Sequence, residues 1–383
     1  LPPEAITVMP DINTAYFTTI TLLSISDSAK EASTKAIMAA GETYYANLEN
    51  IYIASSRYDY SASGTKDLIY RGSSSTEIQK VSLVGGEVTP LSSGTVKGTL
   101  CSQFAMDEYD GYLRVATNLW SYDSKTSSQT NNFYVLDQDM KIVGKLEGLA
   151  PGETMYSVRF SGKTVYAVTY RQIDPFFVID LTDPTKPVVK GELKIPGFSN
   201  YLHPYSDTLV IGFGMDTIET SSTTAITQGF KISMFDVSDP QSPKEVHKIL
   251  IGDRGSYSNI NYDHKALLFS KEKNLIGIPI TIYKSDSSDA SAYGRLTFEG
   301  YIVLGYDAQK GFYEKGRVTH IEDLSAAQYN SDGAYQSITR GVYIGDVLYT
   351  LSNNMVVSTS LTTFKRIDKV EMRYPSAPVS SDV

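Results

Sequence analysis

Two arginines and an aspartate within one short stretch form the strongest candidate cluster for chemistry. Arg159, Arg171 and Asp174 fall in neighbouring predicted strands and loops, and Gln172 lies between the last two. The planar guanidinium group suits oxyanions, so the arginines could bind a carboxylate or a sulfate at the mouth of a channel. The alternative is an Arg–Asp ion pair that holds a turn. We favour this alternative, because structural ion pairs imitate functional sites.

Histidine supplies the second set of candidates, because its side chain exchanges a proton near neutral pH. His203, which precedes Pro204, is the main acid/base candidate, and His264, which follows Asp263, is the second. A histidine in a β turn is more often a hydrogen-bonded structural residue than a catalyst. The chain also lacks the Gly-x-Ser-x-Gly run of a nucleophile elbow. Paired carboxylates for glycoside hydrolysis remain open, since their separation is not visible in a sequence.

Aromatic residues in polar segments are the third candidate. We expect Tyr58 and Tyr60 to lie in a Ser/Gly-rich loop, and Trp120 and Tyr122 to lie in a loop before a polar run at 123–128. Such rings can stack on sugars or anchor a protein partner. They can equally well pack onto the sheet beneath them. We weigh the two interpretations evenly and take Trp120 as a candidate ligand-binding residue.

Acidic residues occur in two patterns. The run Asp107-Glu108-Tyr109-Asp110 could bind a hard cation, which prefers oxygen ligands. It has no EF-hand or RTX-type spacing, so we predict a solvated turn leading into Gly111. Three further aspartates each end a predicted strand: Asp137, Asp180 and Asp236. Recurrence from repeat to repeat favours turn capping over a single active site. We predict no metal and no cofactor.

Composition excludes several classes of partner. Lys and Arg total 34 against 43 Asp and Glu, a net charge of −9, which argues against binding nucleic acid or an anionic membrane. No apolar run approaches the roughly 20 residues that span a bilayer. Cys101 is the only cysteine, so an intrachain disulfide is impossible. It has no basic neighbour and is a poor nucleophile candidate. With 28 Tyr against one Trp, the aromatic content favours β structure.

Short β-type runs, separated by Gly, Pro, Asn, Asp and Ser, predict an all-β chain. A unit of four strands is clearest between residues 156 and 197 and recurs along the sequence. One small antiparallel sheet cannot bury both faces, whereas radial stacking covers them, so the repeat predicts a β-propeller of four-stranded antiparallel blades. A pair of β-sandwiches is the competing fold. Helix is expected only near 321–328 and 27–34.

The predicted propeller occupies residues 1–383 as one domain. Its six complete blades are placed at residues 41–98, 99–150, 151–197, 198–252, 253–325 and 333–373. Residues 1–40 would supply the two outer strands of a partial seventh blade, whose inner strands are missing from this chain. Residues 374–383 read as a Pro/Ser-rich surface tail.

Three runs carry a family resemblance: Ser102 to Thr117, Gly191 to Pro204, and Ile251-Gly-Asp-Arg-Gly-Ser-Tyr257. Through them the chain resembles a family of secreted bacterial proteins with a C-terminal β-propeller domain distantly related to WD-type repeats. The resemblance extends from about Gly41 to Met372. It implies a propeller, export from the cell and a longer parent chain with further N-terminal β segments. It implies no reaction and no catalytic residues.

These observations predict an extracellular, non-catalytic binding module, monomeric and secreted or at the cell surface, with a protein or a glycan as its partner. Loops and a channel mouth on a rigid propeller would present the ligand-binding residues. The candidates are Arg159, Arg171, Asp174, His203 and Trp120. One alternative is a propeller-type hydrolase or lyase that acts on a glycan through channel-facing carboxylates or His203. Another is a purely structural domain of a larger surface protein.

Overall fold

The computed structural model is built almost entirely from β-strands. It describes residues 1–8, 16–27, 29–38, 41–63, 69–123, 126–170, 174–221, 224–327 and 336–372. Helices in these ranges are single turns: η1 (Pro3–Ala5), η2 (Val84–Gly86), η3 (Gln103–Ala105), η4 (Asn259–Asn261), η5 (His264–Ala266) and α1 (Leu324–Ala327). None of the described helices has the length and hydropathy needed to cross a membrane.

The chain divides into two compact units. The first comprises residues 1–194 with 240–242, and the second comprises 195–239 with 243–383. The assignment of residues 1–383 to one propeller domain stays a prediction.

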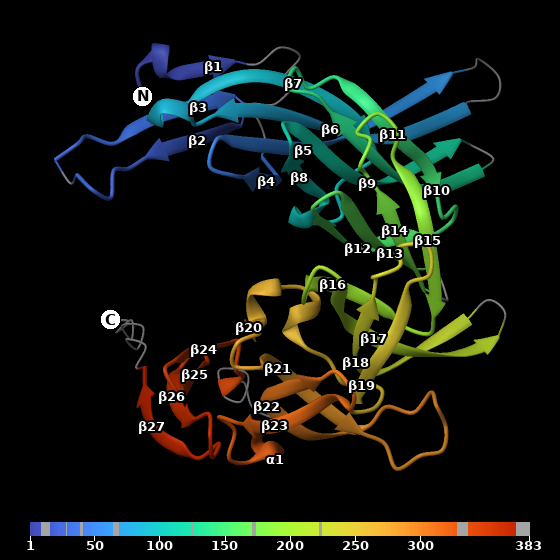
Figure 1. Ribbon diagram of the computed structural model, residues 1–383, viewed down its shortest axis with the longest axis vertical. Coiled ribbons are helices and arrows are strands. Elements are labelled where there is room, and N and C mark those ends of the chain that lie inside the picture. Colours follow the sequence, from blue (N-terminus) through green and yellow to red (C-terminus); the bar gives the residue numbers. More distant parts are fainter. Residues whose placement is uncertain are drawn as a thin grey trace, which may run out of the picture. The chain divides into compact units, whose positions relative to one another are not determined.

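The first unit begins with a three-stranded sheet in the order β1-β3-β2, in which β1 runs parallel to β3. Its strands are β1 (Ile6–Val8), β2 (Phe17–Leu22) and β3 (Ser33–Met38). Next come two antiparallel four-stranded blades: β4 (Thr43–Ala46), β5 (Asn50–Ser63), β6 (Ile69–Ser82) and β7 (Thr89–Lys97), then β8 (Met106–Tyr109), β9 (Tyr112–Asp123), β10 (Thr126–Leu136) and β11 (Ile142–Leu149) (Figure 1). A third blade contains β12 (Thr154–Ser161), β13 (Thr164–Tyr170), β14 (Asp174–Asp180) and β15 (Val188–Ile195).

The second unit holds three more blades of the same kind. The first has β16 (Phe198–Pro204), β17 (Leu209–Ser221), β18 (Thr224–Asp236) and β19 (Lys244–Ile251). The second has β20 (Leu268–Ser270), β21 (Leu275–Lys284), β22 (Arg295–Asp307) and β23 (Gly311–Val318). The third has β24 (Arg340–Ile344), β25 (Val347–Leu351), β26 (Met355–Ser360) and β27 (Arg366–Glu371). Each blade is an antiparallel meander, so the predicted fold class is confirmed.

Central strands of the blades are buried on both faces, as radial stacking requires. In β9, Leu113 and Val115 join an apolar cluster with Ile78 of the preceding blade. Ala116 faces the other way, into a cluster with Ile179 of the following blade. Side chains alternate across a strand, so strands buried on both faces appear in the sequence as largely apolar runs without polar alternation.

A repeated turn ends the third strand of all six described blades. There a side-chain oxygen accepts a hydrogen bond from the backbone N–H two residues further on, at 2.8–3.3 Å. The accepting residues are Ser82, Asp137, Asp180, Asp236, Asp307 and Ser360. Such turns satisfy backbone groups where the ladder stops. The prediction of turn capping by the three aspartates is confirmed, and the pattern is wider than expected.

Two expectations for short elements need correction. The described residues of 27–34 contain no helix, because Ser33 and Thr34 begin β3, whose Ile37 is fully buried. Tertiary packing here outweighs local helix propensity. The N-terminal sheet also contains a strand, β1, that the sequence did not indicate. The expected helix near 321–328 is present as α1, and residue 328 lies outside the described residues.

Candidate functional site

The predicted arginine cluster can be followed only in part. Arg171 and the side chain of Asp174 lie outside the described residues. Arg159, on β12, places its guanidinium 4.7 Å from the ring centroid of Phe104. Such a contact is a cation–π interaction that packs η3 against β12. The described part of this cluster therefore has a structural contact and no assembled oxyanion site.

His203 is held among aromatic side chains of the second unit. Its Nδ1 lies 3.0 Å from the hydroxyl of Tyr201, and its ring meets Phe269 edge-on at 4.4 Å. These contacts fix the imidazole between β16 and β20. The described contacts of His203 are those of a packed, hydrogen-bonded histidine.

Asp263, which precedes the second acid/base candidate His264, has a structural role. Asp263 caps η5 by accepting a hydrogen bond from the N–H of Lys265 at 2.9 Å. Its other oxygen pairs with Arg340 at the start of β24. The carboxylate thereby ties η5 to the last blade.

Two histidines that the sequence did not single out have well-defined partners. His247 Nδ1 lies 3.0 Å from the hydroxyl of Tyr306. His320 is buried, with ring nitrogens 2.8 Å from Thr350 Oγ1 and 3.1 Å from Ser352 Oγ. Burial lowers the pKa of His320 to about 4, so it is neutral at physiological pH.

The acidic run at 107–110 is a structural feature of its blade. Asp110 and Gly111 have positive φ at the β8–β9 turn, as expected. The two preceding carboxylates are not the solvated groups that the sequence predicted. Asp107 pairs with the buried Arg114, and Glu108 accepts hydrogen bonds from three side chains of the preceding blade. Those donors are Asn47, Asn50 and Tyr52, each at 2.9 Å.

No cluster of metal-ligating side chains is present in the described ranges. Cys101 is a free thiol that packs against the apolar cluster beside β12. Burial raises the pKa of the thiol to about 11. It is therefore an unreactive small apolar residue at neutral pH.

The aromatic candidates form the most distinctive surface of the first unit. Tyr58 and Tyr60 lie in β5, and Trp120 and Tyr122 lie in β9, so the expectation that these four residues occupy loops is wrong. Beyond the end of β7, the free edge of β6 pairs with β9 through residues 71–73 and 121–123. The tips of the β5–β6 and β9–β10 hairpins thus form one four-stranded sheet, visible at the upper right of Figure 1.

The pairing register places all four rings on one face of this tip sheet. Tyr60 is opposite Gly72, which is opposite Tyr122; Tyr58 is opposite Ser74, one pair further in. Directly paired residues share a face, and so do residues two apart on one strand. We call this surface, formed by Tyr58, Tyr60, Gly72, Trp120 and Tyr122, the aromatic face. Its rings are 56%, 73%, 38% and 37% exposed, in chain order.

Gly72 lets the rings come together. A Cβ at this position would lie 2.9 Å from the Tyr60 ring and 3.3 Å from the ring of Trp120. Both distances are too short for an ordinary contact, so the rings of the two hairpins close over the glycine. Trp120 and Tyr122 hold their ring planes within 3° of parallel, with centroids 5.9 Å apart. The floor of the face includes Ser74, whose side-chain oxygen is buried without a hydrogen-bond partner among the described residues.

Charged side chains lie on the opposite face of the tip sheet. Arg57 pairs with Asp59 at 3.4 Å, and Arg71 pairs with Asp123 at 3.7 Å. On the aromatic face, the paired strands add only uncharged neighbours among the described side chains: Ser56, Ser74, Asn118, Ser127 and Gln129. The two faces of one sheet therefore differ sharply in chemistry.

The aromatic face is continuous with the next blade. Gln129 is paired with Trp120 across β9 and β10, and its side-chain amide donates to Thr154 Oγ1 of β12 at 2.6 Å. Two residues on, Tyr156 is 38% exposed and meets Tyr170 edge-on at 5.6 Å. A hydrogen bond thus links the tip sheet to the strand of the third blade that carries this second aromatic pair.

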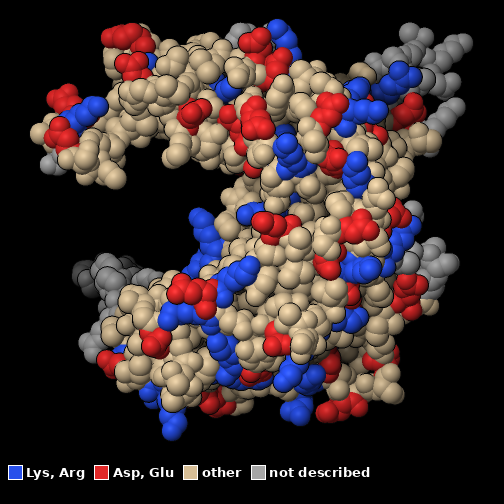
Figure 2. All heavy atoms as spheres, in the orientation of Figure 1, with Lys and Arg blue, Asp and Glu red and all other residues tan. Residues whose placement is uncertain are grey.

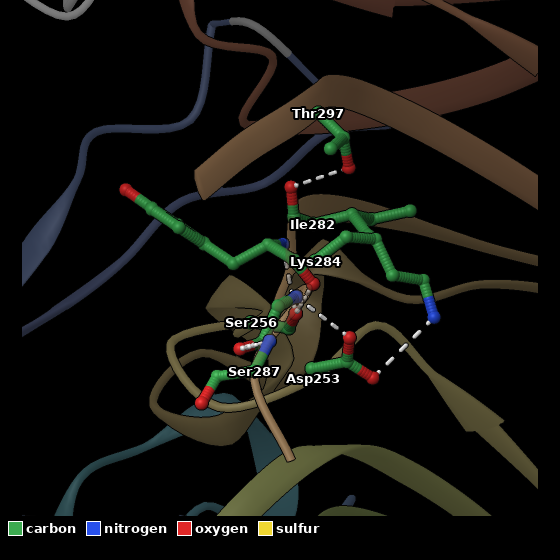
Figure 3. Close-up of polar contacts among 8 residues, drawn as sticks. Asp253, Ser256, Ile282, Lys284, Ser287 and Thr297 are labelled. Carbon is green, nitrogen blue, oxygen red and sulfur yellow. Dashed lines mark hydrogen bonds and ion pairs between the residues drawn. The ribbon is translucent and has the colours of Figure 1, made fainter. Parts of the chain in front are cut away.

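One of the runs that carry the family resemblance has a structural role. The Gly252–Tyr257 loop is pinned against β21: Asp253 accepts from the N–H of Ser285 at 2.9 Å and lies 3.4 Å from Lys284 Nζ. Ser256 Oγ accepts from the N–H of Tyr283 at 2.9 Å (Figure 3). These contacts show that the loop holds the β21–β22 hairpin, and this role accounts for its residues.

Acidic and basic side chains both occur on each unit in the view of Figure 2. Lys and Arg atoms alternate with Asp and Glu atoms on the face of each unit that is shown there. This agrees with the modest net charge of −9.

Together, these sheets define an all-β protein of the propeller class, with four exposed aromatic rings on one face of two joined hairpins. Comparison with known families agrees with this class. Residues 1–364 match the family described as the beta propeller domain, and the chain belongs to that family.

Two archaeal proteins are similar in sequence. An uncharacterized protein of Methanocaldococcus jannaschii, MJ1554, is 35% identical over 298 residues, which is 77% of this chain and 40% of that protein. An uncharacterized protein of Archaeoglobus fulgidus is 38% identical over 204 residues, 53% of this chain and 29% of that protein. The chain thus spans less than half the length of these relatives. Both relatives are archaeal, whereas the resemblance implied a family of bacterial proteins.

Among solved structures, apo AztD from Citrobacter koseri aligns with 84% of this chain and 96% of its own, at a TM-score of 0.34 and 10% identity.

Proposed function

We propose that this chain is an extracellular, non-catalytic binding module that takes its ligand on the aromatic face. The observation that carries the proposal is the gathering of Tyr58, Tyr60, Trp120 and Tyr122 on one side of the tip sheet. Exposed aromatic surface is unfavourable in water, and large Tyr and Trp side chains dominate the energy of recognition surfaces. A rigid four-stranded sheet holds these rings without the entropy cost of ordering a loop.

The absence of chemistry is part of the proposal. Arg159, His203 and Asp263 have the packing and capping contacts described above, and Cys101 is protonated at neutral pH. Among the described side chains of the aromatic face there is no histidine or carboxylate that could act as a general acid or base. The extracellular location rests on the family resemblance, and the single cysteine is compatible with it.

The test is co-sedimentation of the purified chain with the cell-envelope fraction of its source organism. We expect the wild type to sediment with envelopes, and Tyr60→Ala and Trp120→Ala to lose most of that binding. Tyr262→Ala is the matched control, because Tyr262 is 88% exposed and lies in the other unit. Equal sedimentation of all four proteins would show that another surface binds. No sedimentation of the wild type would contradict the binding role itself and favour a purely structural domain.

A further inference from the structure

We propose that the ligand of the aromatic face is a neutral glycan chain. This inference rests on the proposed function and specifies the chemical class of its ligand. A pyranose ring presents C–H groups on its faces and hydroxyl groups around its edge. The C–H groups pack on the electron-rich faces of Trp and Tyr, and the hydroxyls require neutral hydrogen-bonding partners nearby.

The aromatic face supplies both kinds of partner. Besides the four rings, the same side of the tip sheet carries hydroxyl and amide groups from Ser56, Ser127 and Gln129. The tyrosine hydroxyls add donors and acceptors at the ring edges. Aromatic rings bordered by hydroxyls and amides match a sugar, which is itself amphipathic in the same way.

Charge separates a neutral glycan from the other candidates. The ionic side chains Arg57, Asp59, Arg71 and Asp123 point to the opposite side of the sheet and pair there with one another. Single-stranded nucleic acid also stacks on aromatic rings, but its binding grooves carry cations that follow the phosphates. An acidic polysaccharide would need cations for the same reason. The described side chains of the aromatic face provide none.

The extent of the face favours a chain over a single sugar. Rings lie along two adjacent strands, and Gln129 links Trp120 to Thr154, beside the Tyr156–Tyr170 pair of the third blade. Successive sugars of one chain could occupy these positions in turn. A protein partner would more typically need a compact patch of about 800 Å² with a polar and charged rim.

The deciding experiment treats the envelope fraction before co-sedimentation. Periodate cleaves vicinal diols of glycans, and proteinase K digests proteins. We expect periodate to reduce wild-type binding at least tenfold and proteinase K to leave it within about twofold. Binding should also change less than twofold when the salt concentration is raised, since a neutral ligand has no ionic attraction to screen.

Each result has a distinct meaning. Loss of binding after proteinase K, with binding retained after periodate, would overturn the glycan inference while leaving a Trp120-dependent binding module in place. A steep fall with salt would overturn the neutral character of the ligand. Failure of untreated envelopes to bind would instead contradict the proposed function. Circular dichroism and the unfolding midpoint of Tyr60→Ala, altered only at an exposed position, exclude misfolding as the cause of lost binding.

Discussion

The indole ring of Trp120 and the phenol ring of Tyr122 lie parallel to within 3°, with their centroids 5.9 Å apart on the same face of β9. Their strand is joined edge to edge with β6 of the preceding blade. Two blades that pack on a shared apolar cluster therefore also share one exposed surface. Neither hairpin alone would carry more than two of the four rings.

Gly72 gives the sharpest test of this arrangement. Gly72→Ala places a methyl group 2.9 Å from the present position of the Tyr60 ring, so the ring must move. We expect envelope binding to fall several-fold, while the free energy of unfolding changes by less than about 1 kcal/mol, because Tyr60 is mostly exposed. Co-sedimentation and urea unfolding measure the two effects. Unchanged binding would show that the position of Tyr60 is unimportant.

Glu108 is predicted to fasten the first two blades together. Glu108→Ala leaves Asn50 and Tyr52, both buried, without the acceptor that they share. We expect a loss of about 3 kcal/mol, since charged hydrogen bonds within a partly buried network are involved. Glu108→Gln should recover part of it. Urea unfolding checks this prediction, and the exposed Glu87→Ala serves as control. A loss no larger than that of the control would contradict the role of Glu108.

His320 should make the second unit less stable in acid. Its pKa is about 4 when folded, against 6.5 when unfolded, so between these values the unfolded chain binds more protons. Stability therefore rises with pH in this window and is lost as pH falls through it, by up to roughly 3 kcal/mol.

The variant His320→Gln isolates this contribution from that of other titrating groups. Unfolding midpoints of wild type and variant, measured from pH 6.5 down to pH 4, should converge as the pH decreases. Parallel curves would show that protonation of His320 does not destabilise the fold.

Asp253 should govern the opening of the β21–β22 hairpin. Asp253→Ala removes the acceptor of the Ser285 N–H and the partner of Lys284. We expect faster amide hydrogen exchange at residues 284–294, by about tenfold if roughly 1.4 kcal/mol of local stability is lost. Asp286→Ala, at a side chain 87% exposed in the same loop, is the control. Equal hydrogen-exchange rates at residues 284–294 in both variants would show that Asp253 does not hold the hairpin closed.

Much of the fold could be predicted from the sequence because the signals are local. The Asp-Pro turns after Asp180 and Asp236 end the third strands by capping, a short-range interaction that the residue types specify. Burial of the inner half of β9 on both faces likewise appears as a largely apolar run. Strand β1 was not predicted, since three residues paired in parallel with β3 carry no turn signal or period of their own.

The individual residues of the candidate site could be predicted from the sequence, but their assembly on one face could not. Tyr58, Tyr60, Trp120 and Tyr122 stand out in the sequence, and their spacing of two is itself a strand signal that the surrounding Ser and Gly residues obscured. The edge pairing of β6 with β9 joins residues about 50 positions apart in different repeats, and nothing local specifies it. Glu108 was assigned to a solvated turn for the same reason, because its partners lie in another blade.

The central claim is that a ligand sits on Trp120, and the chain offers a direct probe because Trp120 is its only tryptophan. Indole fluorescence can be recorded while glycans released from the envelope fraction are added. The account predicts a saturable change in emission that is absent with periodate-treated glycans and is weakened at least tenfold in affinity by Tyr60→Ala. Binding of the glycans, established by equilibrium dialysis, with no change in Trp120 emission would contradict it.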